Sequence, residues 1–218
     1  MKNIVLVASV IFTLNSIMAD TPITQEPPHE LKIGGAVISP SKTADWTSAS
    51  GGEIQFRFWN SKNTGIGFSI GVQEWDAVSS TYTDSDTSGS VSMNIEGSMT
   101  LIPVGISLLS RTPLTSEMNL VLDAGIKYMR SSSDILVTSY VTQGNTTSVY
   151  VDKVYSEDSL TAVFGIYAEG LKANNMALHL GIGYQIDITK PHESFLGKDI
   201  GTTSFSGAMF SIGLVLSF

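Results

Sequence analysis

Cysteine is absent from this chain of 218 residues. Its absence excludes disulfides, thiolate metal sites, a cysteine nucleophile and the lipidated cysteine of a lipoprotein, and it leaves the redox compartment open. Lys and Arg form no cluster, and the formal net charge is −8. A charge of this sign argues against nucleic acid as a partner. No motif in the sequence predicts a cofactor.

Charge and long apolar runs are also scarce. Charged residues make up 15% of the chain, although hydrophobic residues make up 42%. A water-soluble domain usually has about 25% charged residues. No apolar run approaches the roughly 20 residues that a membrane-spanning helix needs. Such a chain can still cross a bilayer as a closed barrel, because a barrel makes its backbone hydrogen bonds between strands.

The first segment is typical of a secretory signal peptide. A short positive start at 1–3 precedes an apolar stretch at 4–14, and Ala19 is a small residue suited to cleavage. The sequence therefore predicts a signal peptide at 1–19, a Pro-rich periplasmic lead-in at 20–29 and the barrel at 30–218. An N-terminal amphipathic helix is the alternative interpretation of the first segment.

From residue 31 onward, polar and apolar residues alternate with the period of two that is typical of strands. Residues 53–58 (EIQFRF) alternate without exception, and the face opposite the bulky apolar residues is rich in Gly and Ser. This pattern predicts apolar side chains facing lipid and small polar side chains filling a narrow barrel. A soluble barrel with reversed faces is the alternative. Residues expected in the aromatic girdles are Trp46, Trp59, Trp75, Tyr128 and Tyr184.

The spacing of the breaks predicts an all-β fold: an eight-stranded antiparallel transmembrane up-and-down β-barrel. Short turns at 61–64, 111–116 and 172–175 alternate with longer stretches at 41–50, 76–90, 131–158 and 190–202. Short turns are periplasmic in outer-membrane barrels, so both termini are expected there and the long loops outside. The fourth strand is irregular and contains Pro103, which a bulge or an extension beyond the membrane would explain. Strands are expected near 30–40, 51–60, 65–75, 91–110, 117–130, 159–171, 176–189 and 203–218.

Three segments carry a family pattern: the alternating strand 210–218 that ends in Phe218, LIPVG at 101–105, and the related GIKY and GIGY segments at 125–128 and 181–184. On these segments the chain resembles the small outer-membrane barrels of the OmpA, OmpX and OmpW type. The resemblance implies the outer membrane of a bacterium, with lipid and lipopolysaccharide around the barrel. It implies periplasmic chaperones and the barrel-assembly machinery as partners, with Phe218 as the assembly signal. Wall anchoring is not expected, because no peptidoglycan-binding domain follows.

If the apolar faces look outward, charged residues meet in the lumen. Opposite charges should pair there, because an unpaired buried charge is costly. Counting back from the 172–175 turn places Glu169 opposite His179. The sequence favours a salt-bridge plug that fills the lumen, and a gated or ion-conducting path is the alternative. The predicted network consists of Lys32, Glu53, Arg57, Asp123, Lys127, Glu169, His179 and Asp187.

Catalysis and metal binding are only weakly indicated. The histidines are His29, His179 and His192. None is expected on a lipid-facing surface beside a Ser with a carboxylate behind it, as activation of a Ser requires. Asp76 and the 84–86 stretch could ligate a hard cation through carboxylate oxygens. Flexible acidic loops are much commoner than such sites, so no metal site is predicted.

The 131–158 stretch is expected to form a hairpin standing above the membrane. Its strand edges could recruit an external protein or surface ligand by strand addition, and a simple extension of the barrel wall is the alternative. The predicted function is therefore a non-enzymatic structural or surface-interaction role. A narrow channel, or a transporter that releases small hydrophobic molecules sideways, is the alternative. Candidate contact residues are Ile135, Val137, Tyr140, Val149 and Tyr150.

Overall fold

The computed structural model describes residues 29–42, 45–85, 89–143, 145–173 and 175–218. The expected signal peptide and all of the lead-in except His29 lie outside these residues. No helix in the described part is long and apolar enough to cross a membrane.

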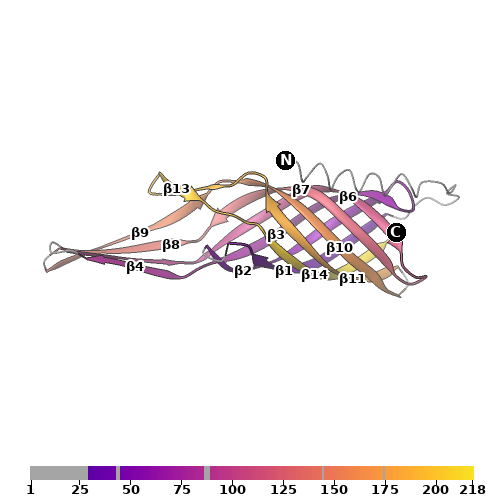
Figure 1. The fold of residues 1–218 in the computed structure, drawn as a ribbon, viewed down its shortest axis with the longest axis horizontal. Helices are drawn as coiled ribbons and strands as arrows, with labels where there is room; N and C mark the ends of the chain where they lie inside the picture. The colour runs from indigo at the N-terminus through magenta and orange to yellow at the C-terminus, as the bar shows by residue number, and fades with distance from the viewer. Residues whose placement is uncertain (1–28, 43–44, 86–88, 144, 174) are drawn as a thin grey trace.

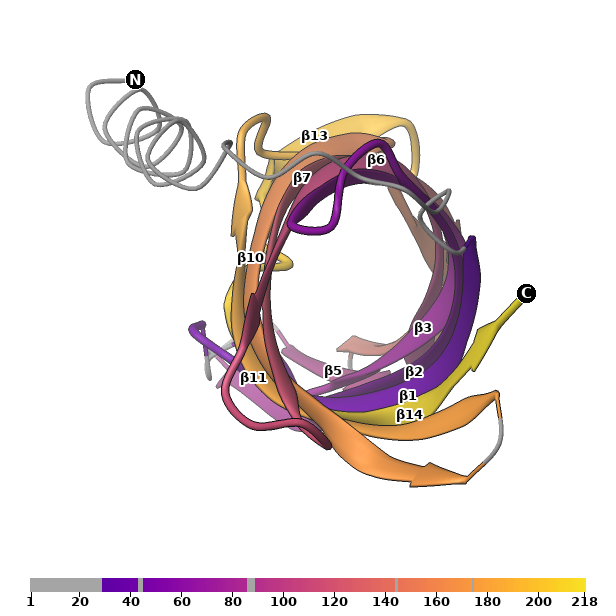
Figure 2. The ribbon, with the colours of Figure 1, turned by 90° about the vertical axis from the view of Figure 1, so that its right-hand side faces the viewer.

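Eight strands form a closed barrel in which each strand pairs with two antiparallel neighbours (Figures 1 and 2). The first and last strands close the ring, with Glu30 opposite Ser217 and Pro40 opposite Gly207. The structure confirms the predicted fold class. Around the ring the order is β1-β14-β11-β10-β7-β6-β3-β2. The strands are β1 Glu30–Pro40, β2 Trp46–Trp59, β3 Thr64–Ala77, β6 Ser98–Pro113, β7 Asn119–Ser133, β10 Ser159–Ala173, β11 Met176–Asp187 and β14 Gly207–Ser217.

Apolar side chains cover the outside of this barrel. On β2, for example, Phe56 and Phe58 are 47% and 46% exposed, whereas the alternating Gln55 and Arg57 are 2% and 0% exposed. A soluble barrel would have the opposite arrangement, because water would then solvate the charged face. The outward residues include Ile33, Ile70, Val104, Ile106, Ile126, Ile166, Ile182, Ile212 and Leu214.

A second, open sheet extends from one end of the barrel (Figure 1). We call it the extension, and we call that end of the barrel the extension end; the opposite end, with the short turns, is the turn end. The extension explains the longer stretches of the sequence, because three of them contain strands rather than loops alone. Its order is β13-β12-β9-β8-β5-β4. The strands are β4 Ser80–Ser85, β5 Ser90–Glu96, β8 Leu136–Gln143, β9 Thr146–Ser156, β12 His192–Phe195 and β13 Lys198–Thr202.

The expected fourth strand is in fact two strands that belong to different sheets. Gly97 separates β5 from β6 with a φ of +128°, a value that L side chains rarely adopt. A Cβ at this position would also lie 2.4 Å from the backbone oxygen of Asp134. The alternation of polar and apolar residues changes phase here because the chain passes from the extension into the barrel wall. A passage between two sheets, rather than a bulge, therefore accounts for the irregularity that the sequence showed here.

Pro103 interrupts one ladder of the barrel wall. β3 and β6 pair from Thr64 to Ile70 and again from Gln73 to Asp76, but Gly71 and Val72 have no partner in that ladder. Proline has no N–H to donate, so a gap opposite it is expected. The other side of β6 is continuous, and Pro103 lies opposite Met129.

Candidate functional site in the barrel lumen

An ionic cluster fills the lumen near the turn end. Arg57 is fully buried; its Nη1 lies 2.6 Å from Glu169 Oε1 and 3.5 Å from Glu30 Oε2. Arg111 donates to Glu30 and also lies over the ring of Trp59, 3.8 Å from its centroid. Paired charges of this kind can remain inside a protein, because each charge compensates the desolvation of the other.

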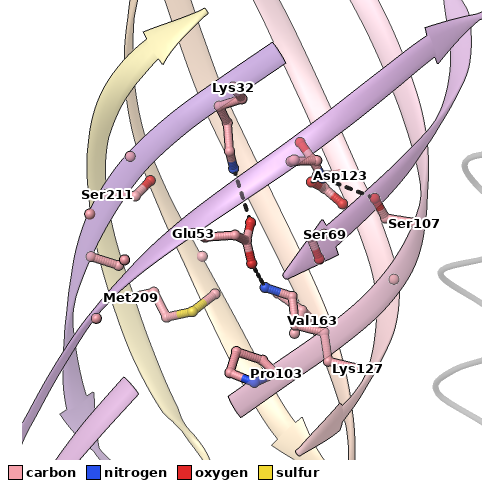
Figure 3. A pocket seen from close by; sticks show the side chains of 18 of the residues that line it. Lys32, Glu53, Ser69, Pro103, Ser107, Asp123, Lys127, Val163, Met209 and Ser211 are labelled. Carbon is pink, nitrogen blue, oxygen red and sulfur yellow. Dashed lines mark hydrogen bonds and ion pairs between the residues drawn. The ribbon is translucent and has the colours of Figure 1, made fainter. Parts of the chain in front are cut away.

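A second group of charges occupies the middle of the lumen (Figure 3). Lys32 and Lys127 both pair with Glu53, and the Lys32 Nζ–Glu53 Oε1 distance is 3.4 Å. Gln55 donates to Asp123 Oδ2 over 3.0 Å, and its Oε1 accepts a hydrogen bond from Arg57 Nε. Gln55 therefore connects this group to the ionic cluster.

A cavity of about 60 Å³ lies beside the middle group. It is lined by Lys32, Glu53, Asp123 and Lys127, and by small residues such as Gly34. A water molecule needs about 10–15 Å³ of such space, so the cavity has room for a few waters. It is far smaller than the roughly 300–1,000 Å³ of an ordinary ligand site.

An aromatic plug closes the lumen at the extension end. Its centre is Phe205, which is fully buried between Trp46 and Trp75, with ring centroids 5.5 and 5.3 Å away. Phe205 belongs to the connection between β13 and β14, which folds inward. Trp46 Nε1 donates to Thr203 Oγ1 over 3.1 Å, so the same connection is also held two residues earlier.

Asp187 fixes the inward connection. Its Oδ2 accepts hydrogen bonds from Phe205 N at 2.8 Å, from Ser204 Oγ at 2.7 Å and from Ser206 Oγ at 3.2 Å. Gln185 donates to the backbone oxygen of Phe205. Asp187 was predicted to belong to the lumen charge network; the structure instead places it at the plug, with no salt-bridge partner among the described residues.

Ser211, His179 and Glu169 form a hydrogen-bonded row across three strands. His179 Nδ1 lies 3.1 Å from Glu169 Oε1, and its Nε2 lies 3.5 Å from Ser211 Oγ. The order of groups is that of a nucleophile, a base and an orienting carboxylate. However, the Ser–His contact is long, Glu169 also binds Arg57, and His179 is 1% exposed. Sequence reasoning placed Glu169 beside His179 but overlooked Ser211.

The sequence matches no family profile and no curated protein. Among solved structures, the outer membrane protein OprG from Pseudomonas aeruginosa is similar with a TM-score of 0.54 and 9% identity, covering 88% of this chain and 95% of that one. Neisserial surface protein A has a TM-score of 0.49 and 14% identity over 88% and 96% of the two chains. A major outer membrane protein from Thermus thermophilus has a TM-score of 0.49 and 9% identity over 87% and 99%. The fold is that of a small outer-membrane β-barrel.

The tryptophans of this outer-membrane barrel do not form the expected girdles. Trp46, Trp59 and Trp75 are 1%, 3% and 0% exposed, and all three lie inside the barrel. That prediction was wrong because it used residue type without strand phase. Trp59 is in phase with the inward Arg57 and Trp75 with the inward Gln73, and a register shift separates Trp46 from the phase of the rest of β2. Tyr128 and Tyr184 do face outward, at 49% and 40% exposure.

The structure separates the five predicted contact residues of the 131–158 hairpin. Ile135 and Val137 are each 5% exposed and belong to the apolar cluster around the plug, so they are not accessible to a partner. Tyr140, Val149 and Tyr150 are 43%, 54% and 62% exposed. One edge of the hairpin is covered, because β8 pairs with β5 along its length; on the other edge β12 pairs with β9 only from Val154 to Ser156, so residues 146–153 have no second partner strand among the described residues.

The remaining predicted residues lie at the two ends of the barrel. Phe218 is 71% exposed at the turn end, and its backbone pairs with that of His29. Asp76 accepts a hydrogen bond from Ser48, and Asp84 lies on β4, while Asp86 is outside the described residues. Within the part that the structure describes, no three His, Asp or Glu side chains converge to hold a metal ion.

Two charged lumen residues were missed. Glu30 and Arg111 belong to the ionic cluster, and each is in phase with an inward residue of its own strand, Lys32 and Leu109 respectively. The same alternation that identified Lys32 therefore contained the signal for Glu30. What the sequence could not give was the height of each residue along the barrel axis, which decides which charges meet.

Proposed function

We propose that this protein is an integral outer-membrane barrel of a bacterium, without enzymatic activity, that acts structurally or through surface interactions of its extension. The extension then lies outside the cell and both termini in the periplasm. The outward apolar belt supports the membrane location, because lipid solvates such a surface and water does not. Lipid and lipopolysaccharide would surround the belt, and periplasmic chaperones and the barrel-assembly machinery would act during biogenesis, with Phe218 as their signal.

One observation carries the proposed function: the lumen is obstructed at two levels. Arg57 and its carboxylates occupy the turn end, and Phe205 with its two tryptophans occupies the extension end. The cavity between them holds only a few waters. An obstructed lumen supports a structural role better than conduction. The extension is then the part of the protein that is available for interaction.

Single-channel recording with purified protein in lipid tests the first half of this proposal. We expect no stable channels, and anomalous migration in unheated detergent gels should show that the barrel is folded. Stable channels from folded protein would contradict the structural role and favour conduction.

Shortening the extension tests the second half. Val137 and Asp152 lie opposite each other on β8 and β9, so an Asn-Gly turn can replace residues 138–151 between them. The buried Ile135 and Val154 remain in this variant. We expect binding to the surface or partner under study to be lost while gel mobility is unchanged. Full binding by the folded variant would exclude the hairpin.

The row of Ser211, His179 and Glu169 provides a test of the non-enzymatic assignment. A fluorophosphonate probe labels an activated serine: the serine oxygen bonds to phosphorus, the P–F bond breaks and fluoride leaves with the hydroxyl proton. We expect no labelling of the folded protein, because Ser211 lies in an obstructed lumen and its Oγ is 3.5 Å from His179 Nε2, which is long for a base that must take its proton. Labelling that disappears in both Ser211→Ala and His179→Ala would establish a reactive serine and contradict the proposal.

Sideways release of a small hydrophobic molecule is the second candidate function. The interrupted ladder at Pro103 favours it, because Pro103 lines the lumen cavity and marks the place where β3 and β6 are least paired. Uptake of a hydrophobic probe into vesicles should fall in Pro103→Val if this seam is used, since Val restores the missing N–H. Equal uptake by both proteins would exclude the seam.

A further inference from the structure

The two outer edges of the extension differ in how well they are protected. An exposed edge strand carries unpaired N–H and C=O groups, and proteins usually protect it with Lys, Pro, bulges or short strands. β13 has such features: its ladder with β12 contains a register shift, Gly201 has a φ of +129°, and Lys198 is exposed. β13 is therefore a poor template for another strand.

β4 has only two of the usual protections, its modest length and the charge of Asp84. All six residues from Ser80 to Ser85 pair with β5 in one uninterrupted register, and all six are exposed. The strand contains no Pro, Gly, Lys or Arg. No other described strand pairs with its outer edge. The 131–158 hairpin also has an open stretch, residues 146–153 of β9, but this stretch ends at Lys153, a residue type that protects an edge, whereas β4 has no cation.

The side chains of β4 indicate what a strand added to this edge would contain. Tyr82 lies opposite Met93 and Asp84 opposite Val91, and this face continues toward the buried apolar cluster through Ile95. Thr81 and Thr83 lie on the other face, opposite Asn94 and Ser92. A matching strand would place an apolar residue opposite Tyr82, a cationic residue opposite Asp84 and hydroxyl residues on the other face.

Charge and shape agree with a cationic partner. The described residues 78–85, 89–97, 134–143 and 145–158 contain six carboxylates but one Lys, and that Lys153 is already paired with Asp134 at 2.8 Å. A pocket of about 160 Å³ lies at the end of β4, lined by Asp84, Val91 and Val141 among others. An aliphatic stem ending in a positive charge suits such walls, because the stem contacts the valines and the charge meets the carboxylate.

We propose that the outer edge of β4 binds an extended, basic segment of another polypeptide, which adds to the sheet as an antiparallel strand. Backbone hydrogen bonds provide the affinity, and the pair of positions opposite Tyr82 and Asp84 provides the specificity. The inference rests on the proposed function, because it requires the extension to be outside the cell. A second copy of this chain fits less well, since it would bring two acidic sheets together.

Peptide binding to the folded full-length protein tests the proposal. The probe is a fluorescent peptide, Thr-Lys-Thr-Val-Thr-Val. In an antiparallel register its Lys lies opposite Asp84 and its first Val opposite Tyr82, and its Thr residues then share the face of Thr81 and Thr83. We expect saturable binding. A peptide of the same sequence with alternate backbone amides N-methylated should not bind, because it cannot form the ladder. Equal binding of both peptides, or binding of neither, would overturn the proposal.

Charge reversal gives the specificity test. Asp84→Lys should weaken binding of the Lys peptide by about five- to tenfold, since an exposed attraction is replaced by a repulsion. It should strengthen binding of a peptide with Glu in place of Lys. Glu96→Lys is the matched control, because it makes the same charge change on β5 beyond the end of β4, and it should change binding much less. Similar effects of the two variants would show nonspecific attraction and overturn the proposal.

Cross-linking locates the binding edge, and the absence of cysteine makes it specific. With oxidised glutathione added as the oxidant, Thr83→Cys should form a disulfide with a peptide that carries Cys opposite it, and Lys198→Cys on β13 should not. Equal cross-linking at both edges would contradict the proposal, and disulfide-linked dimers of Thr83→Cys that exclude the peptide would show a second copy as the occupant. Gel mobility and conductance are measured on the same samples. A failure of peptide binding with a folded, non-conducting barrel therefore leaves the proposed function standing.

Discussion

The barrel and the extension are two separate sheets of one chain, and they distribute their apolar side chains differently. Every barrel strand has two neighbours, and its apolar face points outward, away from a charged interior. In the extension the two faces are mixed: Ile95 and Val137 continue the buried inner surface, but the other face carries Tyr140 and Val149 beside Ser92. The separation of polar and apolar faces is therefore strict in the barrel and weak in the extension, although both sheets are paired antiparallel.

The second difference is in how charges are held. In the barrel, Arg57 is enclosed and has two carboxylate partners, whereas in the extension the Lys153–Asp134 pair is exposed to solvent. A buried partner cannot be removed without leaving its counterpart uncompensated, but a solvent-exposed one is easily replaced by water. Mutations in the two regions should therefore have very different consequences.

Removing Arg57 should have the largest effect. Arg57→Ala leaves Glu30 and Glu169 without their shared cation, and we expect a loss of about 3–5 kcal/mol in the free energy of unfolding. Urea unfolding in lipid vesicles measures it. Lys153→Ala removes the exposed pair and should cause no measurable change. Comparable losses in both variants would contradict the distinction between the two regions.

Phe205→Ala should have the next largest effect, about 3 kcal/mol, because it leaves a cavity between Trp46 and Trp75. Tryptophan emission should shift to longer wavelength as water reaches the rings. Tyr150→Ala, in the exposed part of the extension, is the control and should remain within about 0.5 kcal/mol of the parent. An unchanged emission spectrum in Phe205→Ala would show that the plug is not formed in lipid.

Gly181 tests the packing of the lumen wall. A Cβ at this position would lie 1.9 Å from the ring of Tyr167, which itself packs against His179. Gly181→Ala should therefore cost about 2 kcal/mol by displacing that ring. Gly52 faces outward and a Cβ there meets nothing closer than 3.7 Å, so Gly52→Ala should be nearly neutral. Urea midpoints of the two variants provide the comparison, and equal midpoints would disprove tight packing on the inner side.

The smallest expected effect is a pH dependence in the extension. Burial raises the pKa of the Glu193 carboxyl, and the nearby Asp45 raises it further. The folded state therefore binds this proton more tightly than the unfolded state does. The contribution of Glu193 to the free energy of unfolding is fully present below its pKa in the unfolded chain, and it is lost as the pH rises through its pKa in the folded protein. Glu193→Gln should remove this loss. We expect its free energy of unfolding to exceed that of the parent by on the order of 0.5 kcal/mol at pH 7 and to equal it at pH 4. Urea midpoints at both pH values test it, and an equal gain at both would exclude ionisation as the cause.

Strand phase explains how much of this structure the sequence could predict. Alternation in 53–58 and similar segments was enough to predict the eight-stranded barrel and to place Glu53, Arg57 and their counterparts on the inner face. Counting back from the short turn also placed Glu169 opposite His179, and the structure has this pair although the register shifts between Gly170 and Ala173. These features depend on contacts between neighbouring strands, which a local pattern can report.

The extension and the plug depend on contacts that the local pattern does not contain. Alternation with a period of two does not indicate which sheet a strand joins. The sequence therefore predicted loops where β4, β12 and β13 lie, and it predicted barrel wall where β5 lies. Phe205 was included in the last strand, although it lies in a connection that folds inward across the barrel mouth. Its position follows from hydrogen bonds to Asp187 and from two tryptophans that lie far earlier in the chain.

The direct pairing of β1 with β14 has a consequence for how the molecule can be made. The eleven residues of β1 pair with the eleven residues of β14, and nearly the whole sequence lies between the two strands. Until β14 pairs with β1, the sheet has two unpaired edges. In the membrane no water can hydrogen-bond to the backbone groups of these edges. Assembly must therefore be close to an all-or-nothing event, and a chain that stops before Gly207 should be degraded rather than inserted.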